Sequence, residues 1–388
     1  MWTEKSTGMR STVLPPAHQT LIDNNPTFAA HHLRSTRRVA QALARYAKRA
    51  HPSPDDICKL VIKMTSMCNL RCEHCFQWRD AGFHHLIDPT AIPFDQCEHL
   101  FDFAKRTQCD IILNGGEPTV HPDFGKFVDR FAQLGCYVYI CTNGLMIGRY
   151  MDVFNRHHSQ LAFLISVDGI EPVHNAIRGK GTYKKTMEGI RLLSEGKQAG
   201  KQWLIGIENT LMSKNLGGAL TLVDNAEAAG VDWMIFNHLW IASLAARSEY
   251  DVFCRDFGVT PHSYVGFDTG DFSEDYIERV WSTVCKLREH GAKIPLLFGP
   301  DFDRATLFAY YKGRLSARPY PKMGVKLDVD IGGKLVLTKQ FPDLAFGSVL
   351  AQPIESLMAS HNYRRAAELL RHGSLRLLNA CADTYNFE

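Results

Sequence analysis

Short apolar runs alternate with amphipathic segments over residues 57–240. The apolar runs predict strands, and the segments between them carry apolar residues at helical spacing. The predicted strands are Leu60–Met64, Asp110–Leu113, Tyr137–Cys141, Ala162–Val167, Leu204–Glu208 and Trp233–Asn237. The predicted helices lie near 94–107, 123–134, 147–156, 182–196 and 215–229. Such alternation predicts an α/β fold with a parallel sheet and right-handed crossovers. Because a closed barrel needs eight strands, we expect a partial (β/α)6 open barrel.

Other patterns flank this region. Residues 29–51 predict a basic helix that includes Arg34, Arg38 and Arg45. It is either a surface helix packed on the main domain or a docking face for an anionic partner or membrane surface. Further helices are predicted at 274–289, 301–312 and 353–371, and a hairpin joins Val325–Asp330 to Lys334–Thr338. We expect an N-terminal irregular segment with the basic helix (1–56), the barrel (57–240), a helical linker region (241–322) and a small α+β extension (323–388).

The composition is that of an ordinary globular protein. Hydrophobic residues make up 45% of the 388 residues and charged residues 22%, which excludes disorder over most of the chain. A formal charge of +3 is too small to argue for a nucleic-acid partner. The chain has no long apolar run and no apolar core of a secretory signal, so we expect no transmembrane segment and a cytoplasmic location. In that compartment clustered thiols serve metal or redox chemistry rather than disulfides.

The strongest chemical signal is the segment Cys68-Asn69-Leu70-Arg71-Cys72-Glu73-His74-Cys75, directly after the first predicted strand. Three thiolates in one loop can face one metal centre, and thiolates are the usual ligands of iron–sulfur clusters. Three ligands leave one iron of a four-iron cluster open, whereas structural zinc normally takes a fourth protein ligand. We therefore expect one [4Fe–4S] cluster on Cys68, Cys72 and Cys75. The alternative is a non-catalytic iron–sulfur or zinc-binding protein.

With these residues the sequence resembles the radical S-adenosylmethionine (radical SAM) superfamily. The resemblance rests on the CxxxCxxC motif, on Phe76 directly after it, and on three further motifs in order. These are Asn114-Gly115-Gly116-Glu117-Pro118 after the second strand, Cys141-Thr142-Asn143-Gly144 after the third, and Ser166-Val167-Asp168-Gly169 at the end of the fourth, with Arg178 downstream. The match covers roughly residues 57–240, and four ordered motifs are more specific than any one.

The resemblance implies that S-adenosylmethionine (SAM) binds the open iron through its amino and carboxylate groups. Its contacts would come from Phe76, Gly115, Gly116, Glu117, Asn143, Ser166, Arg178 and Ile207. Glu117 would accept hydrogen bonds from the ammonium group, Arg178 suits a carboxylate, and Ile205 or Ile207 would flank the adenine. One electron from an external donor, such as flavodoxin or ferredoxin, would cleave SAM to methionine and a 5′-deoxyadenosyl radical, which takes a hydrogen atom from the substrate.

The segment 323–388 resembles the SPASM or twitch extension of many radical SAM enzymes, without its cluster ligands. Met323 and Thr338 stand where cysteines are expected around Gly333, and Cys381 near the end has no second thiol. We therefore expect no auxiliary cluster, which favours rearrangement, elimination, epimerisation or decarboxylation. Epimerisation would need a hydrogen-atom donor, for which Cys254 and Cys285 are candidates by elimination.

Side chains that follow strands lie at the mouth of such a barrel, where active sites form. On this ground Gln77, Trp78, His238 and Trp240 are candidates for contact with the substrate. We expect a polar small molecule such as a sugar, a nucleoside or another natural-product intermediate. Two features favour a small molecule over a peptide. Residues 1–56 predict no strand pair of the kind found in peptide-recognition domains, and peptide modifiers usually keep the auxiliary clusters that this chain is expected to lack. Radical modification of a ribosomal peptide is the alternative.

Overall fold

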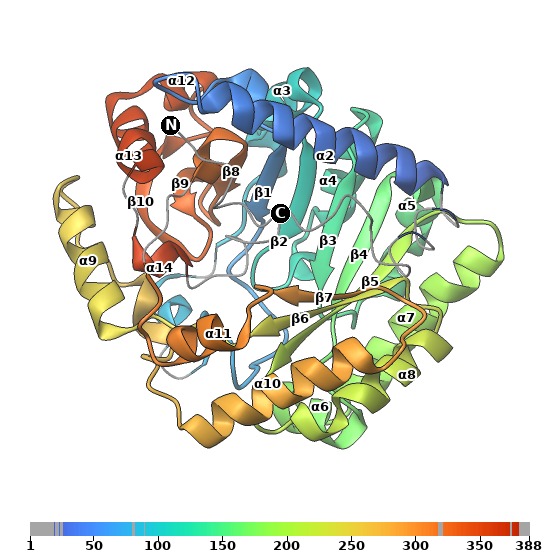
Figure 1. Cartoon of the computed structure of the whole chain (residues 1–388). Coiled ribbons are helices and arrows are strands. Elements are labelled where there is room, and N and C mark those ends of the chain that lie inside the picture. Colours follow the sequence, from blue (N-terminus) through green and yellow to red (C-terminus); the bar gives the residue numbers. More distant parts are fainter. Residues whose placement is uncertain are drawn as a thin grey trace.

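The computed structural model describes residues 19, 23, 26–79, 82–88, 90–316, 321–372 and 375–379. Its strands form one ten-stranded sheet in the order β10-β9-β8-β1-β2-β3-β4-β5-β6-β7 (Figure 1). Strands β1 to β7 run parallel to one another in chain order. They are β1 (Lys59–Lys63), β2 (Asp110–Asn114), β3 (Val138–Thr142), β4 (Leu161–Ser166), β5 (Leu204–Leu211), β6 (Trp233–His238) and β7 (Leu296–Gly299). The predicted partial barrel is confirmed.

Helices follow the strands as the pattern predicted, and two more helices that were not predicted lie at 171–178 and 244–255. They are α3 (Glu98–Thr107), α4 (Phe124–Gln133), α5 (Met151–Arg156), α6 (Glu171–Arg178), α7 (Thr182–Gln198), α8 (Ala219–Ala228), α9 (Leu244–Arg255), α10 (Glu274–Glu289) and α11 (Arg304–Tyr311). One strand in this part of the chain was also not predicted. The region 241–322 was expected to be helical, but β7 pairs with β6 over Leu296–Gly299. Four residues between Pro295 and Pro300 are too short a run to show a strand period.

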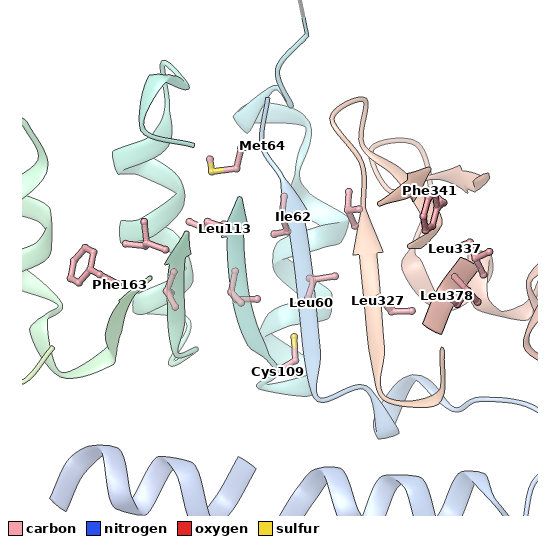
Figure 2. Close-up of a cluster of buried hydrophobic side chains, with 14 of the residues drawn as sticks. Leu60, Ile62, Met64, Cys109, Leu113, Phe163, Leu327, Leu337, Phe341 and Leu378 are labelled. Carbon is pink, nitrogen blue, oxygen red and sulfur yellow. The ribbon is translucent and has the colours of Figure 1, made fainter. Parts of the chain in front are cut away.

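Residues of the strands alternate between two environments. One set faces the helices and forms the main hydrophobic core. Figure 2 shows Leu60 and Ile62 of β1 beside Leu113 of β2 and Leu327 of β8 in this core. Because successive side chains of a strand point to opposite faces, the intervening residues, such as Val61 and Ile112, face the other side of the sheet, where the cavity described below lies.

The C-terminal strands continue the barrel sheet rather than forming a separate sheet. The predicted hairpin is present as β8 (Lys326–Val329) and β9 (Lys334–Thr338), and β8 pairs in parallel with β1. Strand β10 (Phe341–Ser348) was not predicted, and the expected helix at 353–371 is divided into α12 (Ile354–Ala359) and α13 (His361–His372), with α14 (Arg376–Asn379) after it.

Met323 and Thr338 are both buried among these C-terminal elements. The Met323 carbonyl accepts a hydrogen bond from the Tyr363 hydroxyl, and the Thr338 hydroxyl bonds the side chain of Gln340. Cys381 lies outside the described residues. The likeness to a SPASM or twitch extension therefore stays a prediction.

The basic N-terminal helix is α2 (Pro26–Tyr46), which crosses the amino-terminal ends of the barrel strands (Figure 1). Arg38 donates hydrogen bonds to the carbonyls of Ile57, Thr107 and Gln108. Arg45 and Arg49 lie 2.6 and 2.8 Å from the buried carboxylate of Asp56. These contacts confirm that the helix is packed on the main domain. No helix in the described ranges is long and apolar enough to cross a bilayer.

Candidate active site

A cavity of about 570 Å³ lies on the face of the sheet opposite the main core. Every barrel strand from β1 to β7 contributes at least one side chain to its wall. The predicted residues that line it are Cys68, Cys72, Cys75, Phe76, Gln77, Gly115, Gly116, Glu117, Asn143, Ser166, Arg178, His238 and Trp240. The fold thus brings residues from all four motifs, which span more than 100 positions of the chain, to one site.

The three thiols of the cluster motif are partly buried at this cavity. Burial raises the pKa of Cys68 to about 12 and that of Cys72 to about 11, and the neighbouring thiols add to both shifts. Such thiols become thiolates when a cationic metal centre binds them. Among the residues that the structure describes, no three His, Cys, Asp or Glu side chains converge as the ligands of one metal ion do. Each thiolate of a [4Fe–4S] cluster binds a different iron, so three thiols serve three of the four irons.

Gly115 and Gly116 pack the turn after β2 against the chain that enters the cluster loop. Gly115 has a φ of +151°, and a Cβ there would lie 2.6 Å from the Thr65 carbonyl oxygen. A Cβ on Gly116 would collide with the carbonyl of Met67. The glycines are therefore required for the approach of two backbone segments. This packing places Glu117, whose N–H donates to the Met67 carbonyl at 2.9 Å, beside the cluster loop.

The Glu117 carboxylate is buried and held by four hydrogen bonds. Oε1 accepts from the Thr119 N–H (3.1 Å), the Thr119 hydroxyl (2.5 Å) and the Thr142 hydroxyl (2.7 Å). Oε2 accepts from the Asn143 N–H at 2.7 Å. Burial raises the pKa of Glu117, and these donors oppose the shift. A carboxylate oxygen has room for more than one donor, so Oε2 can also accept from an ammonium group in the cavity.

Asn143 connects the third motif to the cluster loop. Its side-chain amide N–H donates to the side-chain Oδ1 of Asn69 at 2.7 Å, and its own Oδ1 accepts from the Leu145 N–H at 3.1 Å. The link fixes the loop between Cys68 and Cys72 against the end of β3. Ser166, at the end of β4, lines the same cavity.

Arg178 lies between the cluster motif and the fourth strand's motif. Its Nε donates to Asp168 Oδ2 at 2.6 Å, and its Nη1 lies 3.8 Å from the Sγ of Cys72. Burial by itself would raise the pKa of Asp168, but Arg178, His74 and the Thr210 N–H hold it below its ordinary value. The role of Asp168 was not predicted. The sequence did contain a signal for this role, because Asp168 is an acidic residue that follows a strand and lies ten residues before Arg178.

Aromatic side chains form the wall next to the cluster loop. The ring of Phe76 lies 4.6 Å from that of Phe267 and 5.4 Å from that of Trp240. Trp78, a substrate candidate, does not line the cavity. Its indole N–H donates to the Ser66 carbonyl at 2.8 Å, and the Arg71 guanidinium lies 4.0 Å from its ring. Trp78 therefore stabilises the loop.

His238 lines the cavity from the end of β6. Burial lowers its pKa to about 3, so the ring is neutral near pH 7. Its Nδ1 lies 3.3 Å from the Tyr311 hydroxyl, and its ring stacks on Phe302 at 5.5 Å. A neutral imidazole in this position is suited to hydrogen bonding rather than to charge pairing.

Besides Trp78, four predicted residues lie away from the cavity. Ile207 alternates with Glu208 along β5, so Glu208 faces the cavity and Ile207 packs in the core instead of flanking an adenine. Ile205 lies in the same core. Cys254 is buried on α9, where burial raises its pKa to about 12, and Cys285 is on α10. Neither thiol lines the cavity.

A fourth thiol does line the cavity. It is Cys141 of β3, which belongs to the motif after the third strand but was not predicted to take part in the chemistry. It lies two residues after Tyr139 and therefore shares its inward face. The alternation of inward-facing and outward-facing side chains along β3 was the sequence signal that could have placed Cys141 in the cavity.

Comparisons with known proteins agree with this geometry. The sequence is 24% identical over 225 residues to Fe-coproporphyrin III synthase of Methanosarcina barkeri, covering 57% of this chain and 52% of the relative. It is 32% identical over 137 residues to the mycofactocin maturase MftC of Mycolicibacterium smegmatis, covering 35% and 34%. The matches thus span about half or less of the length of these relatives.

The fold is also similar to a solved structure. Streptococcus suis SuiB bound to precursor peptide SuiA superposes with a TM-score of 0.57 at 15% identity, over 89% of this chain and 74% of SuiB. The same protein has been solved with S-adenosylmethionine. Residues 62–203 match the Radical SAM superfamily, whose members hold a [4Fe–4S] cluster and SAM. This chain therefore carries a radical SAM domain.

Proposed function

We propose that this protein is a radical SAM enzyme that removes a hydrogen atom from a carbon of a peptide substrate. The observation that carries the proposal is that the three motif thiols, the Glu117 carboxylate and the Arg178 guanidinium line one cavity. When bound, the cluster and SAM supply a 5′-deoxyadenosyl radical, using one electron from an external donor such as flavodoxin or ferredoxin.

The residues of this chain bind and orient the cofactors. Cys68, Cys72 and Cys75 would hold three irons and leave one open for SAM. Glu117 would accept from the ammonium group of SAM, since its Oε1 is fixed by three donors and its Oε2 by one. Arg178, anchored by Asp168, keeps a positive charge beside Cys72.

The aromatic wall would exclude water from the reacting carbon. Phe76 packs between Phe267 and Trp240 next to the cluster loop. A radical in a wet site would meet other hydrogen donors, and exclusion of such side reactions is the part the protein plays in cofactor enzymes.

A peptide substrate replaces the small molecule that the sequence favoured. The support is the likeness to SuiB, which has been solved with a precursor peptide, and to a mycofactocin maturase. A carboxylated tetrapyrrole is the second candidate, because the relative matched over 57% of this chain is an Fe-coproporphyrin III synthase. A cytoplasmic location suits a cluster that needs reduced surroundings and a flavodoxin or ferredoxin partner.

The proposal is tested on the anaerobically reconstituted protein with a strong reductant. SAM should be cleaved to 5′-deoxyadenosine and methionine, slowly without substrate and faster with a peptide encoded beside the gene. A deuterated peptide should transfer deuterium to 5′-deoxyadenosine, as read by mass spectrometry. S-adenosylhomocysteine as the main product would indicate methyl transfer and contradict the proposal.

A further inference from the structure

The cavity has a flat aromatic surface at some distance from the cluster loop. Trp233 is the first residue of β6, lines the cavity and is partly exposed. The next residue, Met234, is buried in the main core. Because successive side chains of a strand point to opposite faces, Trp233 belongs to the inner wall of the barrel rather than to that core.

Gly206 of β5 is the cross-strand partner of Trp233 and lies under its indole. A Cβ on Gly206 would lie 2.3 Å from two indole atoms, Cε2 and Cζ2, and 2.9 Å from Cδ2. Cε2 and Cδ2 form the bond that the two rings share, so the glycine meets the flat face of the indole and not its rim. A glycine inside a strand often marks such a close approach. One face of the indole is therefore seated on the backbone of β5.

Apolar neighbours support the indole in this position. Trp233 packs against a small buried cluster of Tyr137, Ala162 and Leu204, near the amino-terminal ends of β3, β4 and β5. Since the backbone of Gly206 covers one face of the indole, the other face is the one that lines the cavity.

The aromatic rings at the cluster end already stack on one another. Phe76 lies 5.4 Å from Trp240, and the Trp240 ring stacks on Phe267 with an angle of 12° between the planes. Such pairs stabilise the wall of the cavity. Trp233, by contrast, has a strand backbone behind its ring and the cavity in front of it.

Trp233 also lies away from the residues expected to hold SAM. Trp233 and Asn237 are near opposite ends of β6, and the four residues between them correspond to about 13 Å along a strand. Gly206 comes two residues, or about 7 Å, before Glu208. Glu208 pairs with Ser166 at the carboxyl end of β4. The indole is therefore deeper in the cavity than the SAM end, by the length of a side chain.

We infer that the Trp233 indole is the surface on which an aromatic side chain of the substrate peptide stacks. The inference rests on the proposed function and adds a substrate preference to it. Stacking of two rings is favourable beyond the burial of apolar area. A ring on Trp233 lies about 7 Å below the SAM end, so the α- and β-carbons of the same residue extend toward the site of hydrogen removal. A tetrapyrrole is also flat, but a cavity of about 570 Å³ that must hold SAM as well favours a single ring.

The test measures binding to the SAM-loaded, cluster-containing protein without reductant, so it does not depend on turnover. The probes are three blocked tripeptides with alanine at both ends and phenylalanine, cyclohexylalanine or alanine in the middle. Phenylalanine and cyclohexylalanine bury similar apolar areas, but only phenylalanine is flat and aromatic. Titration calorimetry should show that the phenylalanine peptide binds roughly threefold to tenfold more tightly than the cyclohexylalanine peptide. The alanine peptide should bind most weakly.

Variants then locate the stacking surface. Trp233→Leu should remove the preference for phenylalanine over cyclohexylalanine, whereas Trp233→Phe should retain it. Gly206→Ala should weaken the preference, because the new Cβ displaces the indole. Trp281→Leu, which changes a tryptophan of α10 outside the cavity, is the matched control. Circular dichroism checks that each variant is folded.

The adenine of SAM is flat as well, so the affinity for SAM is measured in the same variants. Trp233→Leu should bind SAM as the wild type does. A loss of SAM affinity in this variant, with the fold intact, would assign the indole to the cofactor and overturn the inference.

Equal affinity for the phenylalanine and cyclohexylalanine peptides, or no measurable affinity for any of the three, overturns the inference. A preference that survives in Trp233→Leu overturns it as well. Binding of coproporphyrin III by a protein that binds none of the peptides would assign the surface to a tetrapyrrole instead. Failure of the wild-type protein to cleave SAM under reductant would contradict the proposed function, which the binding measurement leaves untouched.

Discussion

The Nε of Arg178 donates to Oδ2 of Asp168 at 2.6 Å, and the same guanidinium lies 3.8 Å from the sulfur of Cys72. The sequence predicted that Arg178 would meet the carboxylate of SAM. In the structure a protein carboxylate, fully buried, already fixes one side of the guanidinium. Asp168 therefore positions a cation next to the cluster thiols before any cofactor binds.

The buried pair predicts a large effect of Asp168→Asn on stability. Removal of one partner leaves the Arg178 charge without compensation, which costs about 3–5 kcal/mol for a buried pair. Anaerobic urea unfolding of the holoprotein measures the change. The matched control is Glu188→Gln, which breaks an exposed pair with Arg191 and should lower the free energy of unfolding far less, because water screens that pair. Equal effects of the two substitutions would show that the Asp168 pair is not structurally important.

The cluster motif predicts a single cubane. Anaerobic reconstitution should give about four irons and four sulfides per chain, and the triple change of Cys68, Cys72 and Cys75 to alanine should abolish them. Cys254→Ala and Cys285→Ala are the controls, since neither thiol lines the cavity. Iron and sulfide assays with electron paramagnetic resonance measure the outcome, and eight or twelve irons would reveal an auxiliary cluster.

Glu117→Ala should weaken SAM binding. Loss of a charged acceptor for the ammonium group corresponds to about 1.5–3 kcal/mol, which is roughly a tenfold to hundredfold rise in Kd. Calorimetry on the cluster-containing protein measures it. The control is Glu73→Gln, because Glu73 lies within the cluster motif but is exposed and pairs with Lys214. Comparable affinity for SAM in the Glu117 variant and the wild type would show that Glu117 does not bind SAM.

The positions of the thiols predict which of them can take part in hydrogen transfer. Cys254→Ser and Cys285→Ser should leave product formation per 5′-deoxyadenosine unchanged, because both side chains lie outside the cavity. Cys141→Ser is the informative comparison, since that thiol lines the cavity. Product analysis under single-turnover conditions measures the coupling. A stall before product in the Cys254 or Cys285 variant would require a conformation different from this one.

Buried His238 predicts a loss of stability in acid. Its folded-state pKa of about 3 lies below the ordinary value of 6.5, so the unfolded chain binds the proton more readily. The stability contributed by the neutral ring is complete above about pH 6.5 and is lost as the pH falls toward 3. Between pH 7 and pH 5 this amounts to about 2 kcal/mol.

His238→Phe should reduce the loss of unfolding free energy between pH 7 and pH 5 by that amount, as measured by urea unfolding at both pH values. Exposed His361 supplies the control, and His361→Gln should leave the pH dependence as in the wild type. An identical pH dependence in the His238 variant and the wild type would contradict the burial argument.

The sequence determined the parallel barrel and the cluster motif. Apolar runs such as Leu60–Met64 and Ala162–Val167 alternate with helical patterns over the whole domain, and this local rhythm is sufficient to predict a parallel sheet. Three thiols within eight residues likewise need no tertiary information to indicate a metal centre. The order of the four motifs is also a property of the sequence alone.

Only the tertiary structure decided which side chains face the cavity. Ile207 and Glu208 are neighbours in sequence, but the pleat of β5 sends one to the core and the other to the site. The strand β7 and the pairing of β8 with β1 depend on contacts between distant segments, which no local period records. Lys59 and Lys326 illustrate this, because they are 267 positions apart in the chain and become neighbours only when their strands share hydrogen bonds.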